Sequence, residues 1–173
     1  MKICTSRLTI RPMTMADLQA SFAHRSCPQT SRYISDQITL AQAKQRLAEN
    51  CQPWLGEENQ RLALAITLNG LNELIGEVMF KYTNKTSLVG EIGYRLKKEV
   101  IGKGYAFEAV NAFIAQLFSQ LEVMKIVAVC AVDNTPSWRL MEKLQMQREG
   151  VFKSHFLIGG ERLDAYSYGI CRP

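Results

Sequence analysis

The sequence has few of the residues from which metal centres and disulfide frameworks are built. It contains only two histidines, His24 and His155, and its five cysteines are scattered with no C-x-x-C pair. Neither a zinc site nor a set of structural disulfides is therefore expected. Cysteines that remain reduced are typical of cytoplasmic proteins. We predict a cytoplasmic protein without a metal cofactor.

Long apolar segments are also missing. No run approaches the ~20 apolar residues that a membrane-spanning helix needs, and the N-terminal segment lacks the ~7–15 apolar residues of a secretory signal. The 173 residues are 47% hydrophobic and 21% charged, which is ordinary for a globular protein. Neither internal repeats nor Gly/Ser-rich linkers divide the chain. We predict one domain covering residues 1–173, without membrane association.

Positive charge is in modest excess and gathers at one place. The net charge is +5, but no motif interleaves aromatic and basic residues, so nucleic-acid binding is not favoured. Four cations, Arg95, Lys97, Lys98 and Lys103, stand close together around a pair of glycines. This clustering predicts a local anion site.

Hydrophobic periodicity predicts an α+β fold. We expect strands at residues 7–13, 62–68, 73–80, 87–96, 125–132, 147–157 and 163–170, and helices from Thr14, from Thr39, over 105–121 and from Pro136. The order is β-α-α-β-β-β-α-β-α-β-β, with a mixed, mostly antiparallel central sheet flanked by helices. Asn69-Gly70 and Gly159-Gly160 are expected to form tight turns. The strand–helix–strand unit over 87–132 predicts a locally parallel pair joined by a crossover helix.

The segment IGKGYA, residues 101–106, lies between a predicted strand and a predicted helix. Glycines let the backbone approach a ligand closely, and the free N–H groups at a helix N-terminus carry partial positive charge. Together these features favour a phosphate site, although Gly102 and Gly104 could equally form only a tight turn. The phosphate-binding motifs G-x-x-x-x-G-K-[ST] and G-x-G-x-x-G are both absent.

Several segments together resemble the GNAT N-acetyltransferase superfamily, namely EIGYRL, IGKGYAFEA and NTPSWRLMEKLQM. The first and last segments, SRLTIRPMTMADL and REGVFKSHFLIGGERLDAYSYGI, are similar to the ribosomal-protein-alanine (RimJ/RimL-type) branch. The resemblance covers nearly the whole chain. It implies a GNAT-like fold and an N-acetyltransferase that uses acetyl-CoA as the acetyl donor.

The resemblance also implies where acetyl-CoA binds. Its pyrophosphate would lie against Ile101, Gly102, Lys103, Gly104, Tyr105 and Ala106. Its pantetheine arm and acetyl group would lie beside Ile92, Gly93 and Tyr94, and Asn134 would hydrogen-bond the pantetheine amides. Gly93 within a strand itself suggests a bulge or a close backbone approach, but two alternatives stay open, a plain helix cap for Asn134 and a simple edge distortion for Gly93.

The resemblance implies a direct attack of an amine on the thioester carbonyl. Ser137 is expected to hydrogen-bond the sulfur, because the position where the wider family often has a proton-donating tyrosine is Met141. Glu91, beside the expected acetyl site, is the first candidate for the general base. His155, Asp164 and relay through water without any single base are the alternatives.

Three functions remain open. The first is acetylation of a primary amine, such as a protein N-terminus, and the second is acetylation of a small-molecule amine. The third is a catalytically silent acyl-CoA-binding or sensor module, which the missing tyrosine at Met141 would fit. The acceptor is expected to be selected by residues 24–37 and by the last hairpin, residues 154–162, whose mixed charge does not define a substrate.

Overall fold

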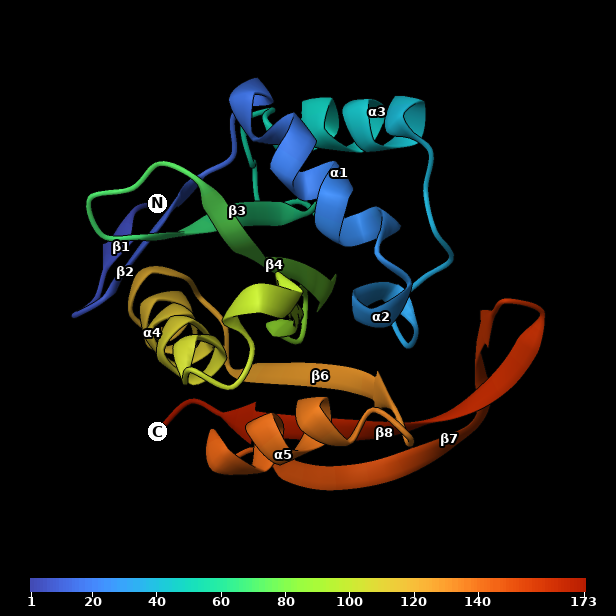
Figure 1. Cartoon of the computed structure of the whole chain (residues 1–173). Helices are drawn as coiled ribbons and strands as arrows, with labels where there is room; N and C mark the ends of the chain where they lie inside the picture. The colour runs from blue at the N-terminus through green and yellow to red at the C-terminus, as the bar shows by residue number, and fades with distance from the viewer.

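One eight-stranded sheet organises residues 1–173 in the computed structural model, with strands in the order β1-β2-β3-β4-β5-β6-β8-β7 (Figure 1). The strands are β1 (Ile3–Cys4), β2 (Leu8–Pro12), β3 (Leu62–Leu68), β4 (Leu74–Asn84), β5 (Val89–Leu96), β6 (Lys125–Ala131), β7 (Gln147–Ile158) and β8 (Glu161–Cys171). The helices are α1 (Leu18–Ser26), α2 (Pro28–Ser31), α3 (Leu40–Asn50), α4 (Tyr105–Gln120) and α5 (Thr135–Lys143), with single 3-10 turns at Met15–Asp17 and Lys98–Val100. All pairings are antiparallel except that of β5 with β6.

The predicted α+β fold and element order are confirmed, with two additional short elements. Strand β1 has two residues and helix α2 has four, so neither is long enough to show a hydrophobic period. Helix α2 begins at Pro28, a favourable first helical position, within residues 24–37, for which the sequence predicts no helix.

Local signals in the sequence place several boundaries correctly. The helix predicted from Thr39 begins there: the hydroxyl of Thr39 accepts from the backbone N–H of Gln42 at 3.2 Å, as part of a capping box. Ile158 pairs with Glu161 across the two-residue Gly159-Gly160 turn, as predicted. The tight turn predicted at Asn69-Gly70 is present: Gly70 has a φ of 80° and the N–H of Leu71 donates to the carbonyl of Leu68 at 3.0 Å, although β4 begins only at Leu74. The Asn69 side chain also donates to the backbone carbonyls of Thr5 and Ser6 in the β1–β2 loop, which joins the turn to that loop.

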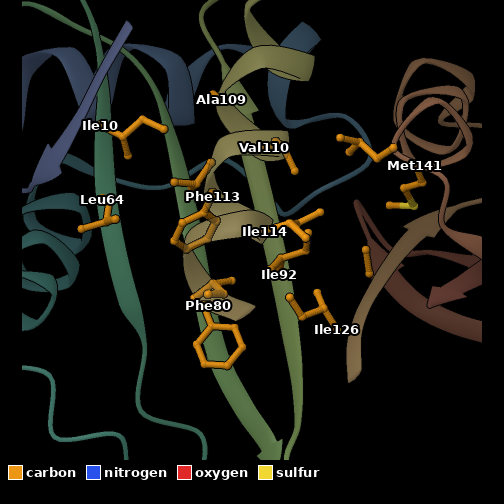
Figure 2. Packing of buried hydrophobic residues seen from close by; sticks show 14 of the residues in the cluster. Ile10, Leu64, Phe80, Ile92, Ala109, Val110, Phe113, Ile114, Ile126 and Met141 are labelled. Atoms are coloured by element: carbon orange, nitrogen blue, oxygen red, sulfur yellow. The ribbon is translucent and has the colours of Figure 1, made fainter. Parts of the chain in front are cut away.

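The largest cluster of buried apolar side chains lies between the sheet and α4. Phe113 of α4, fully buried, packs with Ile10, Leu64 and Phe80 of the sheet, and Figure 2 shows these side chains meeting beneath the helix. The apolar stripe predicted for residues 105–121 is thus the face that α4 buries. None of the helices is both long and apolar enough to cross a bilayer.

A second, smaller cluster lies on the opposite face of the sheet, beneath α1 and α3 (Figure 1). It contains Met13, Leu47, Ala63, Ala65 and Leu74. Side chains alternate between the two faces along each strand. On β5, residues 91, 93 and 95 consequently face the side of α1 and α3, opposite positions 81, 79 and 77 of β4.

Candidate active site

The central strands β5 and β6 separate partway along their length. Their parallel pairing joins Val89–Glu91 to Lys125–Val127 and stops there, so β5 beyond Glu91 has no hydrogen-bonded strand on that side. A cavity of about 420 Å³ opens at this split. Its walls include Ile92, Gly93 and Tyr94 from β5, Val129 and Cys130 from β6, and Asn134 and Met141 from the segment that follows. The split therefore brings three of the predicted cofactor residues to one wall and Asn134 to another.

The glycine turn precedes α4 in the conformation that an anion cradle needs. Gly102 and Gly104 have φ values of 83° and 80°, in the left-handed region that side chains rarely adopt. Gly104 is the N-cap of α4, and residues 101–104 are exposed. The first N–H groups of an α-helix have no intrahelical acceptor, so those of Tyr105 and Ala106 are available to a bound anion.

The turn is held in place by a contact that the sequence does not reveal. Arg7 donates to the carbonyl of Lys103 at 3.0 Å and forms an ion pair of 2.6 Å with Glu108 in the first turn of α4. Glu108 also accepts from the hydroxyl of Thr5 and from the backbone N–H of Arg7. Burial alone would raise the pKa of Glu108, but these hydrogen bonds lower it to about 2. The partners lie about one hundred residues apart along the chain, so no local pattern predicts them.

Tyr94 and Ser137 meet across the split. The Tyr94 hydroxyl lies 3.1 Å from the Ser137 hydroxyl and donates to the Ser137 carbonyl, also at 3.1 Å. Burial raises the pKa of Tyr94 well above its usual range, so this phenol stays protonated. The structure thus places a tyrosine hydroxyl beside the serine that we expected to face the sulfur.

The alternatives left open for Asn134 and Gly93 can be compared with the structure. The Asn134 side chain makes no cap hydrogen bond to α5, although the residue stands at the N-cap and lines the cavity. Gly93 pairs with Met79 in a regular ladder, so a bulge at this position is wrong. A Cβ atom at Gly93 would lie 3.1 Å from the Met79 side chain, which indicates close packing instead. Met141 is 2% exposed and belongs to the core cluster.

The candidate bases differ in their surroundings. Glu91 lines the cavity, and its carboxylate lies 3.4 Å from the ammonium of Lys81. His155 also lines the cavity. Asp164 accepts from Lys153 at 2.7 Å and from the backbone N–H of Ser154, which lowers its pKa and keeps it within the hairpin. Of the three, only Glu91 and His155 face the cavity.

A buried polar cluster joins α1 to β4 next to the cavity. Glu77, 5% exposed, accepts from the hydroxyl of Ser21 at 2.6 Å, lies 3.1 Å from Nε2 of His24 and forms an ion pair with Arg25. Burial alone would raise the pKa of Glu77, but the hydrogen bond from His24 and the charge of Arg25 lower it to about 2. Burial lowers the pKa of His24, so the ring is neutral at pH 7. A carboxylate within a buried apolar strand is the one sequence signal that could have indicated this cluster.

The four cations near the glycines do not form one site, which corrects the predicted grouping. Arg95 faces α1 and α3, opposite Glu77, on the side of the sheet away from α4. Lys97 forms an ion pair with Glu73. Lys98 and Lys103 are exposed. Strand alternation separates Arg95 from its sequence neighbours, so only the backbone of the turn and the exposed lysines remain near α4.

Comparisons with known proteins agree with this architecture. The model of a family described as "Acetyltransferase (GNAT) domain" matches residues 7–147. The uncharacterized N-acetyltransferase YnaD of Bacillus subtilis (strain 168) is 33% identical, over 98% of this chain and 96% of its own length.

Solved structures extend the likeness to the whole fold. A GNAT-family acetyltransferase from Bacillus anthracis superposes with a TM-score of 0.87 at 31% identity, covering 99% of both chains. The ribosomal alpha-N-protein acetyltransferase RimL in complex with coenzyme A superposes with a TM-score of 0.81 at 18% identity, covering 99% of this chain and 98% of its own. The split sheet, the glycine turn and these matches lead to one conclusion: the chain belongs to the GNAT family and is an N-acetyltransferase.

Proposed function

We propose that the protein transfers an acetyl group from acetyl-CoA directly to a primary amine, and that a protein N-terminus is the acceptor. The observation that carries the proposal is the position of the cavity, which opens where β5 and β6 separate and is lined by both strands and by Asn134 and Met141. We further propose that residues 1–173 act as one domain in the cytoplasm.

The residues present fit acetyl-CoA. The positive φ values of Gly102 and Gly104 hold an exposed turn at the N-terminus of α4, where a diphosphate is stabilised by N–H groups and by the helix dipole. The Asn134 amide, free of a capping bond, can pair with the amides of the pantetheine arm. The edge of β5 beyond Glu91, which has no strand partner in β6, can donate a backbone N–H to the developing oxyanion.

Acetyl-CoA supplies an activated thioester whose carbonyl carbon accepts the amine. The C–N bond forms and the C–S bond breaks; the amine loses a proton, and the departing sulfur ends as a thiol. A thiol pKa near ~8.5 means that the leaving sulfur needs only modest help. Ser137, whose carbonyl accepts from Tyr94, turns its hydroxyl toward the sulfur and donates a hydrogen bond to it, while Glu91, His155 or water accepts the proton of the amine.

Replacing the serine tests this role. Ser137→Ala is expected to reduce kcat by roughly tenfold, because one hydrogen bond to the developing thiolate is lost, and to leave the Kd for CoA within about twofold. Tyr94→Phe, which keeps the ring, is expected to show a smaller decrease, because only the orientation of the serine is lost. The measurements are steady-state thiol release and calorimetric titration with CoA. An unimpaired kcat in Ser137→Ala would remove this serine from the mechanism.

A protein N-terminus as acceptor is supported by the likeness of the fold to that of RimL, a ribosomal alpha-N-protein acetyltransferase. Peptides with different N-terminal residues, incubated with the protein and acetyl-CoA, are expected to release CoA thiol and to gain acetyl at the α-amine. Mass spectrometry locates the modification, and peptides blocked at the N-terminus are the control. Turnover of small amines alone would assign the acceptor to that class instead.

The buried Met141 is the one observation that favours a silent CoA-binding module, because it provides no proton donor at a central position. The same assay separates the two functions. CoA binding without thiol release on any amine would replace the proposed transfer by the silent module.

A further inference from the structure

The cavity continues from the split in the sheet to a group of arginines on the side of α1 and α3. Arg25 comes from α1, Arg46 from α3, Arg61 from the segment before β3 and Arg95 from β5, and all four line the cavity. They belong to four different parts of the chain, so their meeting is a property of the fold and not of a basic segment.

The carboxylates of the cavity do not neutralise these cations. Glu77 and Glu91 are the acidic residues along its walls. Both oxygens of Glu77 are taken up by Ser21, His24 and Arg25, and Glu91 lies beside Lys81. Of the four arginines, only Arg25 has an ion-pair partner among the protein groups.

Arg95 is the most informative of the arginines. It is 8% exposed, and its guanidinium makes no hydrogen bond to a protein group, with Nη1 fully buried. Burial lowers the pKa of Arg95 to about 10, so the group remains charged at neutral pH. A buried charged donor without an acceptor costs free energy, and arginine matches the geometry of carboxylate and phosphate oxygens. The Arg95 guanidinium can therefore donate hydrogen bonds to a bound anion, because the protein itself provides no acceptor for it.

The location distinguishes this anion from the phosphates of CoA. The glycine turn leads into α4, on the other face of the sheet, whereas Arg95 faces α1 and α3. The same cavity also contains Ile92–Tyr94 and Asn134, the proposed site of the acetyl group and the pantetheine arm. An acceptor bound there would have its amine at the split and its remaining groups near the arginines. The tip of the β7–β8 hairpin bounds this region, since the N–H of Gly159 donates to Asp36 before α3 at 2.7 Å (Figure 1).

We infer that the amine acceptor carries a carboxylate group, and that Arg95, with Arg46 and Arg61 beside it, binds this anion. The inference rests on the proposed acetyl transfer for its amine, but the anion site can be tested by binding alone. The anion takes no part in the bond changes; it orients the amine toward the thioester. Free amino acids and peptides with an acidic residue after the N-terminus would both satisfy this chemistry.

The test uses matched pairs of amines that differ in charge. One arm compares free amino acids with their amides, and the other compares peptides with aspartate or asparagine in second place. The anionic member of the accepted pair is expected to have a kcat/KM at least about tenfold higher, the size of one charge-assisted hydrogen bond. The arm that shows the preference identifies the source of the anion. Equal kcat/KM values in every pair would overturn the inference and leave the acetyltransferase intact.

Variants attribute the preference to the arginine. Arg95→Gln is expected to lose most of the preference and to keep its Kd for CoA within about twofold, and Arg95→Lys to keep part of it. Arg148→Gln, an exposed position outside the cavity, makes the same change of charge and is expected to behave like the wild type. If Arg95→Gln does not fold, Arg46→Gln serves in its place. A weaker affinity for CoA in Arg95→Gln would contradict the inference, because it would assign the arginine to the cofactor.

Binding without turnover gives an independent result. The same pairs, titrated calorimetrically into protein saturated with CoA, are expected to show tighter binding of the anionic member. This preference would persist even if no amine were acetylated, in which case the proposed function fails and the anion site stands. Absence of any difference in this titration would overturn the anion site.

Discussion

Gly104→Val is expected to weaken CoA binding by about tenfold or more. Gly104 has a φ of 80°, which a β-branched residue adopts only with strain, and a Cβ atom would lie 3.4 Å from the Arg7 guanidinium. The turn must therefore shift or remain strained, and its N–H groups would no longer face the diphosphate. A tenfold loss corresponds to about 1.4 kcal/mol, within the range expected for such strain. Calorimetric titration with CoA measures it.

A second glycine provides the matched control. Gly150→Val makes the same change in β7, where φ is not positive and a Cβ atom would meet nothing within 4 Å. Its affinity for CoA is expected to equal that of the wild type. Wild-type affinity in a folded Gly104→Val protein would show that the turn does not hold the cofactor.

Glu77→Gln is expected to destabilise the protein by about 3–5 kcal/mol, the cost typical of breaking a buried ion pair. The carboxylate holds α1 to β4 through Ser21, His24 and Arg25, and its removal leaves the partly buried Arg25 guanidinium without a counter-charge. Glu73→Gln is the control, because Glu73 is exposed and pairs with Lys97 at the surface, so a loss below ~1 kcal/mol is expected. Urea unfolding at pH 7 measures both. Equal stabilities of the two variants would contradict a structural role of the buried cluster.

The same cluster predicts how stability depends on pH. The pKa of Glu77 is about 2 in the folded protein and about 4.5 when unfolded, so its contribution is present above pH 4.5 and is lost as the pH falls toward 2. The shift corresponds to about 3 kcal/mol. The pKa of His24 is also lowered by burial, so acid below its usual pKa of 6.5 destabilises the fold further. The difference in stability between the wild type and Glu77→Gln is therefore expected to shrink between pH 4.5 and pH 2.

Much of the fold could be predicted from the sequence because its elements follow local rules. The stripe of α4, the Thr39 cap and the Gly159-Gly160 hairpin each depend on a few neighbouring residues. The Asn69-Gly70 turn follows the same rules, but the hydrogen bonds from the Asn69 side chain to Thr5 and Ser6 join residues 64 and 63 positions apart. Local propensity does not include such contacts.

In the candidate site, too, contiguous residues could be predicted from the sequence, whereas contacts between distant segments could not. The glycine turn is contiguous, so its residues could be named from the sequence and the resemblance. The contact of Tyr94 with Ser137, the brace from Arg7 and the arginine group each join segments far apart in the chain. Arg95 shows the limit most clearly, since it was grouped with neighbours in sequence, whereas strand alternation turns it to the opposite face.

The most direct measurement is a calorimetric titration of the wild type and Gly104→Val with CoA and with pantetheine, which lacks the diphosphate. If backbone N–H groups of the turn bind the diphosphate, the wild type should bind CoA at least about a hundredfold more tightly than pantetheine. Gly104→Val should lose much of that difference while its weak affinity for pantetheine stays the same. Equal affinities of the wild type for the two ligands, or no binding of CoA, would contradict the account.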